Sequence, residues 1–130
     1  MNLLRIVSPI IFSLTLLNFT NVFAADEKVS NATRTMAEII INLHHFPSDT
    51  DQAKLDKLAA DAATSASEKT IAQALKNIKH KVIDTDKSKL EAIAKDATAP
   101  AAVKSLANIL LNLNHQPSEA DSAVLKQISK

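Results

Sequence analysis

The sequence predicts an all-α protein made of three tandem repeats, each a helix, a turn and a second helix. The first observation is a period of 35 residues, which aligns Met36 with Ile71 and Leu106. The second is that apolar residues recur at helical spacing within each unit. A period of this length indicates that one supersecondary unit is repeated and stacked. Further columns of identical residues support the alignment: Ala37, Ala72 and Ala107; Asn42, Asn77 and Asn112; His45, His80 and His115; Asp51, Asp86 and Asp121; Leu55, Leu90 and Leu125.

The first repeat is expected to form helices over residues 31–45 and 49–62. Apolar residues at i, i+3, i+4 and i+7 give the first helix one apolar face. Pro47 disfavours helical backbone in the residue before it and should end this helix. Ser48, with Asp51 three residues later, approximates a capping box at the start of the second helix. The apolar positions are Met36, Ile39, Ile40 and Leu43 in the first helix and Leu55, Leu58, Ala59 and Ala62 in the second.

The second repeat is expected to form helices over residues 66–82 and 86–97. Ser65 and Glu68 match the capping box in full and should open the first of them. The apolar faces comprise Ile71, Leu75, Ile78 and Val82, followed by Leu90, Ile93, Ala94 and Ala97.

The third repeat is expected to form helices over residues 101–115 and 119–129. Thr98 and Pro100 resemble a helix start, because proline is favoured in the first turn. Pro117 and Ser118 repeat the boundary of the first unit. The apolar positions are Val103, Leu106, Leu110 and Leu113, then Leu125 and Ile128. Because equal repeats reproduce one neighbour geometry, we expect a short α-solenoid-like domain, with a compact six-helix bundle as the alternative.

Residues 1–24 are expected to be a signal peptide, and residues 25–130 a single helical-repeat domain. Arg5 precedes a short apolar run, and Val22 and Ala24 supply the compact residues that a cleavage site requires. The run is short for a membrane span. The sequence therefore predicts a periplasmic or secreted protein.

Composition narrows the function classes after residue 24. Loss of Arg5, the one charged residue of the leader, would leave equal numbers of basic and acidic residues. Arg34 is then the only arginine and Phe46 the only aromatic side chain among Phe, Trp and Tyr. Nucleic-acid binding is disfavoured, because phosphate neutralisation and base stacking need such residues. Binding to a membrane surface is also disfavoured, because the chain after residue 24 has no net charge and only one such aromatic side chain. The chain has no cysteine, so export would not bring disulfides.

The pattern Asn-x-x-His-x5-Asp occurs once in every repeat and is the arrangement best suited to chemistry. One interpretation is structural: a histidine in the last helical turn and an aspartate opening the next helix would hold the turn together. The other is a metal site, because imidazole and carboxylate are ligands for zinc, copper or nickel. The candidate ligands are His44, His45, His80, His115, Asp51, Asp86 and Asp121.

Helix spacing argues against a shared metal ion. Packed helices lie about 8–10 Å apart, so we expect the three repeated histidines to form a spaced ladder. No serine recurs with a histidine in a way that indicates a nucleophile and base, so no catalytic residues and no cofactor are predicted.

Partner binding is predicted at Ile41, Phe46 and Leu111. Ile41 and Leu111 widen the apolar stripe of their helices, whereas the middle repeat has Lys76 in this column. No preceding repeat would cover Ile41 in an open stack, so a homodimer or partner contact there is expected. The sequence thus favours an exported protein-binding or scaffolding module without catalytic activity, and a periplasmic metal-binding protein is the alternative.

Overall fold

The computed structural model describes residues 27–130, which form six α-helices and no strands apart from three isolated bridges. This confirms the all-α, six-helix prediction. The signal-peptide prediction lies outside the described residues. No helix within 27–130 is long and apolar enough to cross a bilayer. The helices are α1 (Asn31–Ile41), α2 (Asp49–Ala60), α3 (Ala66–Lys76), α4 (Asp84–Lys95), α5 (Ala101–Asn112) and α6 (Glu119–Ile128).

Serine side chains cap four of these helices at their N-termini. Ser30, Ser48 and Ser118 each accept a hydrogen bond from the backbone N–H three residues later. Ser65 does the same, and the Glu68 side chain completes the capping box that the sequence predicts. The starts of α4 and α5 differ, because Ile83 and Pro100 stand at their N-caps and provide no side-chain hydrogen bond.

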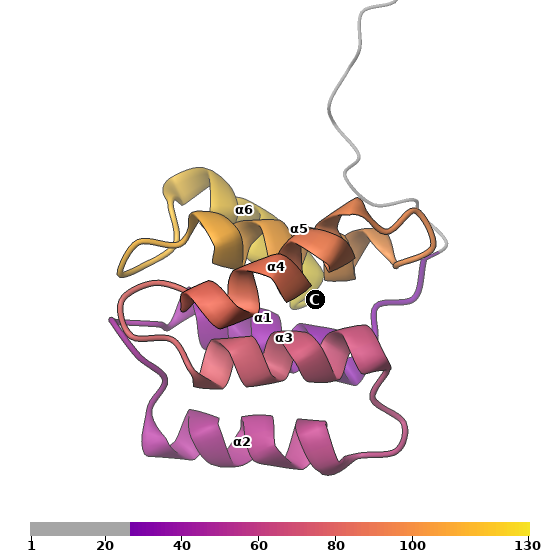
Figure 1. Ribbon diagram of the computed structural model, residues 1–130, viewed down its shortest axis with the longest axis horizontal. Coiled ribbons are helices and arrows are strands. Elements are labelled where there is room, and N and C mark those ends of the chain that lie inside the picture. Colours follow the sequence, from indigo (N-terminus) through magenta and orange to yellow (C-terminus); the bar gives the residue numbers. More distant parts are fainter. Residues whose placement is uncertain (1–26) are drawn as a thin grey trace, which may run out of the picture.

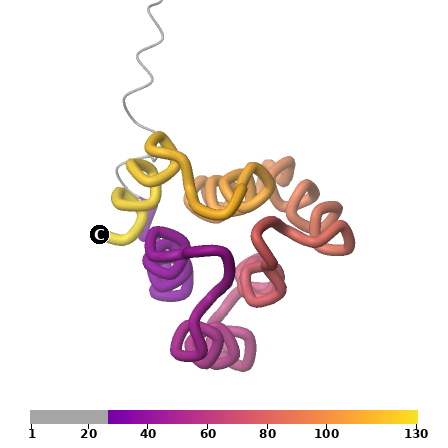
Figure 2. The backbone as a smooth tube through the Cα atoms, turned by 90° about the vertical axis from the view of Figure 1, so that its left-hand side faces the viewer, coloured from indigo at the N-terminus to yellow at the C-terminus, as the bar shows by residue number. Residues whose placement is uncertain are grey.

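The helices close into a ring (Figures 1 and 2). The second helix of each repeat packs most extensively on the first helix of the next, in the pairs α2 with α3 and α4 with α5. The last helix, α6, packs in the same way on α1, and Figure 2 shows the two side by side. At the centre, α1, α3 and α5 contact one another. The fold is therefore the compact six-helix bundle that the sequence left as its alternative, since an open stack would keep the first and last helices apart.

The buried core residues occupy equivalent positions in the three repeats. Met36, Ile71 and Leu106 have no exposed surface and point inward from α1, α3 and α5. The neighbouring alanines of the same helices are also buried, which lets the three central helices approach closely. Each outer helix adds one fully buried leucine, from the column Leu55, Leu90 and Leu125. All three repeats therefore contribute to a single apolar core.

Glu68 joins the first two repeats through a buried polar network. Its Oε1 atom accepts hydrogen bonds from the hydroxyls of Ser30 and Thr33, the latter at 2.7 Å. Its Oε2 atom accepts the Ser65 N–H at 2.8 Å. Burial alone would raise the pKa of the Glu68 carboxyl, but these hydrogen bonds outweigh burial and hold the pKa below its usual value.

The first helix of each repeat is shorter than predicted. These helices end at Ile41, Lys76 and Asn112, so the predicted ends at residues 45, 82 and 115 are wrong. Apolar spacing continued beyond the real ends because Leu43, Ile78 and Leu113 are buried from the turns. The repeated histidines consequently lie in turns and not in last helical turns.

Candidate metal centre

Each repeated histidine occupies the middle of a tight turn between the two helices of its repeat. The backbone φ angles of His45, His80 and His115 are 75°, 71° and 69°, and no other described residue has a positive φ. The Phe46 N–H donates to the His44 carbonyl at 3.0 Å, and the Gln116 N–H donates to the Asn114 carbonyl at 2.8 Å. In the first and third repeats, a positive φ enclosed by such an i to i+2 hydrogen bond matches a γ-turn, which is a strained conformation. In the second repeat the bond runs the other way, because the Lys79 N–H donates to the Lys81 carbonyl at 3.3 Å.

The three turns are tied together by a closed ring of backbone hydrogen bonds. The His45 N–H donates to the His115 carbonyl at 3.0 Å, and the His80 N–H donates to the His45 carbonyl at 2.8 Å. The His115 N–H closes the ring on the His80 carbonyl at 2.7 Å. Every repeat thus gives one donor and one acceptor to its neighbours. This ring fixes the three histidine backbones around an approximate threefold axis.

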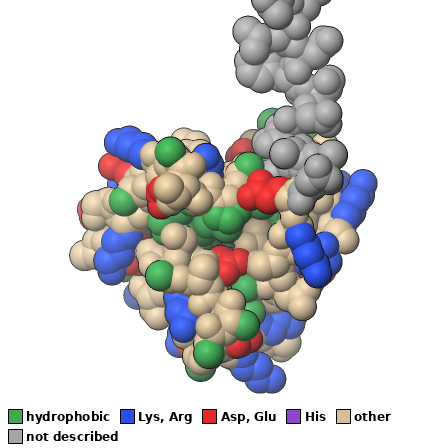
Figure 3. Space-filling view, turned by 90° about the vertical axis from the view of Figure 1, so that its right-hand side faces the viewer, with side chains coloured by type: hydrophobic (Ala, Val, Ile, Leu, Met, Phe, Trp, Pro, Cys, Tyr) green, Lys and Arg blue, Asp and Glu red, His purple; other side chains and the backbone are tan. Residues whose placement is uncertain are grey.

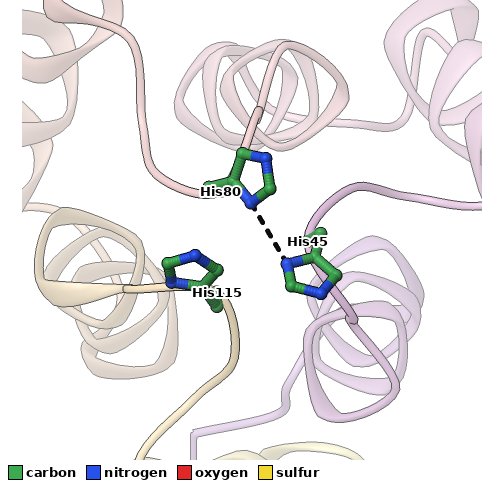
Figure 4. A group of neighbouring side chains, drawn as sticks. All are labelled: His45, His80 and His115. Carbon is green, nitrogen blue, oxygen red and sulfur yellow. Dashed lines mark hydrogen bonds between the residues drawn. The ribbon is translucent and has the colours of Figure 1, made fainter.

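The imidazoles gather at the same place (Figure 4). Their ring centroids are 4.9–5.2 Å apart, and a nitrogen from each ring lies within 4.8 Å of the other two. The Nδ1 atoms of His45 and His80 are 3.1 Å apart. All three side chains are exposed at this end of the bundle. The opposite end, seen in Figure 3, displays no histidine among the side chains in view.

The expected ladder of spaced histidines is wrong. Helix-to-helix spacing governs side chains that project from helix surfaces, but these histidines project from turns that meet on the axis of a closed ring. Ring closure therefore brings together three residues that are 35 positions apart in the chain.

The remaining candidate ligands lie elsewhere. The Asp86 carboxylate is buried and accepts a hydrogen bond from Asn77 Nδ2 at 3.0 Å. Asp51 accepts a hydrogen bond from the Ser48 hydroxyl, and Asp121 lies in the first turn of α6, where its backbone N–H donates to Ser118 Oγ. Neither these carboxylates nor His44 joins the histidine cluster, which in the described residues consists of three imidazoles alone. The aspartates thus lie at the helix starts, and the hydrogen bonds of the described residues include none between a repeated histidine and a repeated aspartate.

A single zinc-sized ion suits this arrangement. Two imidazole nitrogens on one tetrahedral zinc stand about 3.3 Å apart, given Zn–N bonds of about 2.0–2.1 Å. The Nδ1 atoms of His45 and His80, 3.1 Å apart, are close to this spacing. The other ligand nitrogens lie within 4.8 Å, so side-chain rotations that shorten the widest distance by about 1.5 Å would bring all three onto one ion. His115 Nδ1 lies 2.8 Å from Asn114 Oδ1. An amide oxygen can only accept, so a ring that donates to it from Nδ1 would present Nε2 to a metal ion.

The three predicted partner-binding residues differ in exposure. Ile41 and Leu111 are half-buried and pack against the core. The premise that nothing covers Ile41 is wrong, because α6 packs on α1 and Ile41 shares a hollow with Ser122 and Lys126 of α6. Phe46, in contrast, keeps 63% of its surface exposed. The sequence prediction missed Ile83, which is also exposed and lies in the same hollow as Phe46.

Comparison with family models, with curated proteins and with solved structures finds no significant match to this chain. The functional argument therefore depends on the geometry of the chain itself.

Proposed function

We propose that this protein binds a divalent transition-metal ion through His45, His80 and His115. The observation that carries the proposal is their convergence: one imidazole from each repeat, with ligand nitrogens within 4.8 Å of one another. Three neutral imidazoles form a ligand set well suited to zinc, copper(II) and nickel. Their exposure leaves a further coordination position open to water or to an outside ligand. The proposed role is binding, without catalysis.

The strained backbone supports a role for the imidazoles themselves. A non-glycine residue at positive φ costs about 1 kcal/mol or more, whereas glycine adopts this conformation freely. If the turns needed only this backbone shape, glycine would serve better at all three positions. Instead the chain carries histidine three times and contains no glycine at all. Strain retained at a cluster of identical reactive side chains is typical of functional sites.

Metal titration of the purified protein tests the proposal. Isothermal calorimetry with zinc, copper(II) and nickel should give about one equivalent per chain, because three ligands serve one ion. His80→Gly should abolish this binding, since two imidazoles cannot replace three. His44→Gln is the matched control, because His44 lies outside the cluster, and it should bind as the wild type does. Unchanged binding by His80→Gly, or equal losses in both variants, would refute the site.

Protein binding is the second candidate function, as the sequence predicts for a helical-repeat domain. The exposure of Phe46 favours it, because large exposed apolar side chains often belong to contact surfaces. Location in the periplasm or outside the cell also stays a proposal, supported by the sequence of residues 1–24. Sedimentation of the wild type beside Ile41→Lys tests the separate proposal of a homodimer centred on Ile41.

A further inference from the structure

The junction between the first and second repeats departs from the pattern of the other two. Phe46 occupies a column that holds Lys81 and Gln116 in the other repeats, and Ile83 occupies a column that holds Ser48 and Ser118. Both changes replace a polar residue with a large apolar one. These two are also the large apolar side chains that the described part of the chain leaves exposed, at 63% and 37%.

The two departures meet in one hollow of about 710 Å³. The turn after α1 contributes Phe46 and Pro47, and the segment between α3 and α4 contributes Ile78 and Ile83. The equivalent hollow between the third and first repeats is smaller, about 400 Å³, and has Gln116 in place of Phe46. The first junction therefore has a larger and more apolar hollow than the junction between the third and first repeats.

Ile83 occupies its position at the expense of helix stability. Ser48 and Ser118 cap α2 and α6 by accepting the N–H groups of Asp51 and Asp121. Ile83 stands at the same position of α4 and gives no such bond. A residue that breaks a local rule without a gain in packing indicates a function at that place. Ile83 still leaves 37% of its surface exposed, so its burial within the chain is incomplete and a partner outside the chain would complete it.

The charges around the hollow are positive. Lys76 and Lys79 line it, and no carboxylate does. Lys76 pairs with Asp56 across the junction, whereas Lys79 makes no ion pair with the described residues. The equivalent hollow is lined by Glu119 as well as Lys126. Charge complementarity therefore favours an occupant that carries a carboxylate beside its apolar group.

We propose that this hollow docks a short acidic segment of a partner protein, with an apolar side chain inserted between Phe46 and Ile83 and a neighbouring carboxylate on Lys79. Two exposed apolar side chains are too few for a broad interface between globular proteins, which needs an extended contact area. They are sufficient to anchor a short peptide. This inference depends on protein binding, the second candidate function. His80 of the proposed metal site also lines the hollow, so docking is tested in the absence of metal.

A random 12-residue peptide library displayed on phage tests the proposal, with the full chain as bait and a chelator present. Selected peptides should combine a large apolar residue with nearby Asp or Glu. Phe46→Gln and Ile83→Ser should weaken their binding about tenfold or more, as expected of anchor positions. Lys79→Gln should weaken it less, and raising the salt concentration should reduce the difference. Gln116→Ala, in the equivalent hollow, is the control and should bind normally.

The two main variants introduce residues that the other repeats already carry, so both should fold. Ile83→Ser should also raise the melting temperature, because it restores the missing cap. Loss of peptide binding in a protein of higher stability separates docking from folding.

Other outcomes overturn the inference. These are the absence of any peptide that distinguishes the wild type from Phe46→Gln, selection of basic or purely apolar peptides, or dimerisation through this hollow. If a natural partner binds the wild type and both variants equally, protein binding holds and this docking surface is wrong.

Discussion

The Nδ1 atoms of His45 and His80 lie 3.1 Å apart, which is hydrogen-bond distance for two atoms that cannot both be acceptors. One ring must donate a proton to the other, so the pair shares one hydrogen along the line between the rings. A metal ion bound by both nitrogens would replace this hydrogen. The most direct contact in the cluster therefore links metal binding to proton movement.

Metal binding through this pair should weaken in acid. A ring that donates from Nδ1 can bind a metal ion there only if its proton moves to Nε2, or it can turn and bind through Nε2. Neither change releases a proton, because the ring stays neutral, so protons are released only from rings that were charged before binding. Calorimetric titration with zinc over a range of pH, in buffers of different ionisation enthalpy, measures the affinity and the number of protons exchanged. We expect the affinity to fall toward acid and the number of protons released per ion to rise, because protons and metal compete for the imidazoles. An affinity that is independent of pH would argue against coordination by the His45–His80 pair.

Replacing His80 separates the role of its backbone from that of its side chain. At a φ of 71°, His80→Gly should keep or raise stability, because glycine is unstrained there. His80→Ala should be less stable than His80→Gly by about 1 kcal/mol, since alanine keeps the strain. Urea unfolding of the metal-free proteins measures both. Metal binding should be lost in both variants alike.

The opposite order of stability would be informative. If His80→Gly is much less stable than the wild type, the imidazole holds the three turns together in the absence of metal. The structural interpretation of the repeated histidine would then gain over the metal proposal.

The helices were predictable from the sequence because the information is local. Apolar spacing gave the stripes through Met36 and Ile71, and the serine caps at Ser48 and Ser65 gave the starts of α2 and α3. The ends of the first helices were harder to place. Buried residues in the turns, such as Leu43 and Ile78, extend the helical spacing past the point where the helix ends.

The site could be predicted only in part. The sequence singled out the histidine column, but the convergence of the rings depends on closure of α6 on α1 and on the positive φ angles. Neither is encoded in spacing within one repeat. Ile83 was visible as the one apolar residue in a column with Ser48 and Ser118, and comparing the columns for departures as well as identities would have found it.

Glu68 should make stability depend on pH in the acid range. Its pKa is lowered in the folded protein from an ordinary value of 4.5. The carboxylate thus stabilises the fold fully above the unfolded-state pKa, and this contribution is lost as the pH falls through the lower folded-state pKa. Glu68→Gln should reduce stability at pH 7 by about 1–3 kcal/mol, because the charged acceptor of a buried network is removed.

Urea unfolding of both proteins between neutral and strongly acid pH checks this prediction. The difference in stability between wild type and Glu68→Gln should be largest at pH 7 and should shrink toward acid. Glu91→Gln, at an exposed position of α4, is the control and should have little effect. A difference that is constant with pH would mean that the charge of Glu68 does not contribute.

Closure of the ring predicts that the three outer helices contribute equally to stability. Leu55, Leu90 and Leu125 occupy one repeat column on α2, α4 and α6, and each is at most 1% exposed. Leu→Ala at each position should therefore reduce stability by a similar amount, about 2–5 kcal/mol. In an open stack, Leu125 would lie on a terminal helix with a neighbour on one side only, and its substitution would reduce stability less.

Thermal unfolding followed by circular dichroism and by calorimetry measures the stability of the three variants. We expect one cooperative transition in each, lowered by similar amounts, because every outer helix bridges two repeats. A markedly milder effect of Leu125→Ala, or a separate early transition for the third repeat, would contradict the packing of α6 on α1.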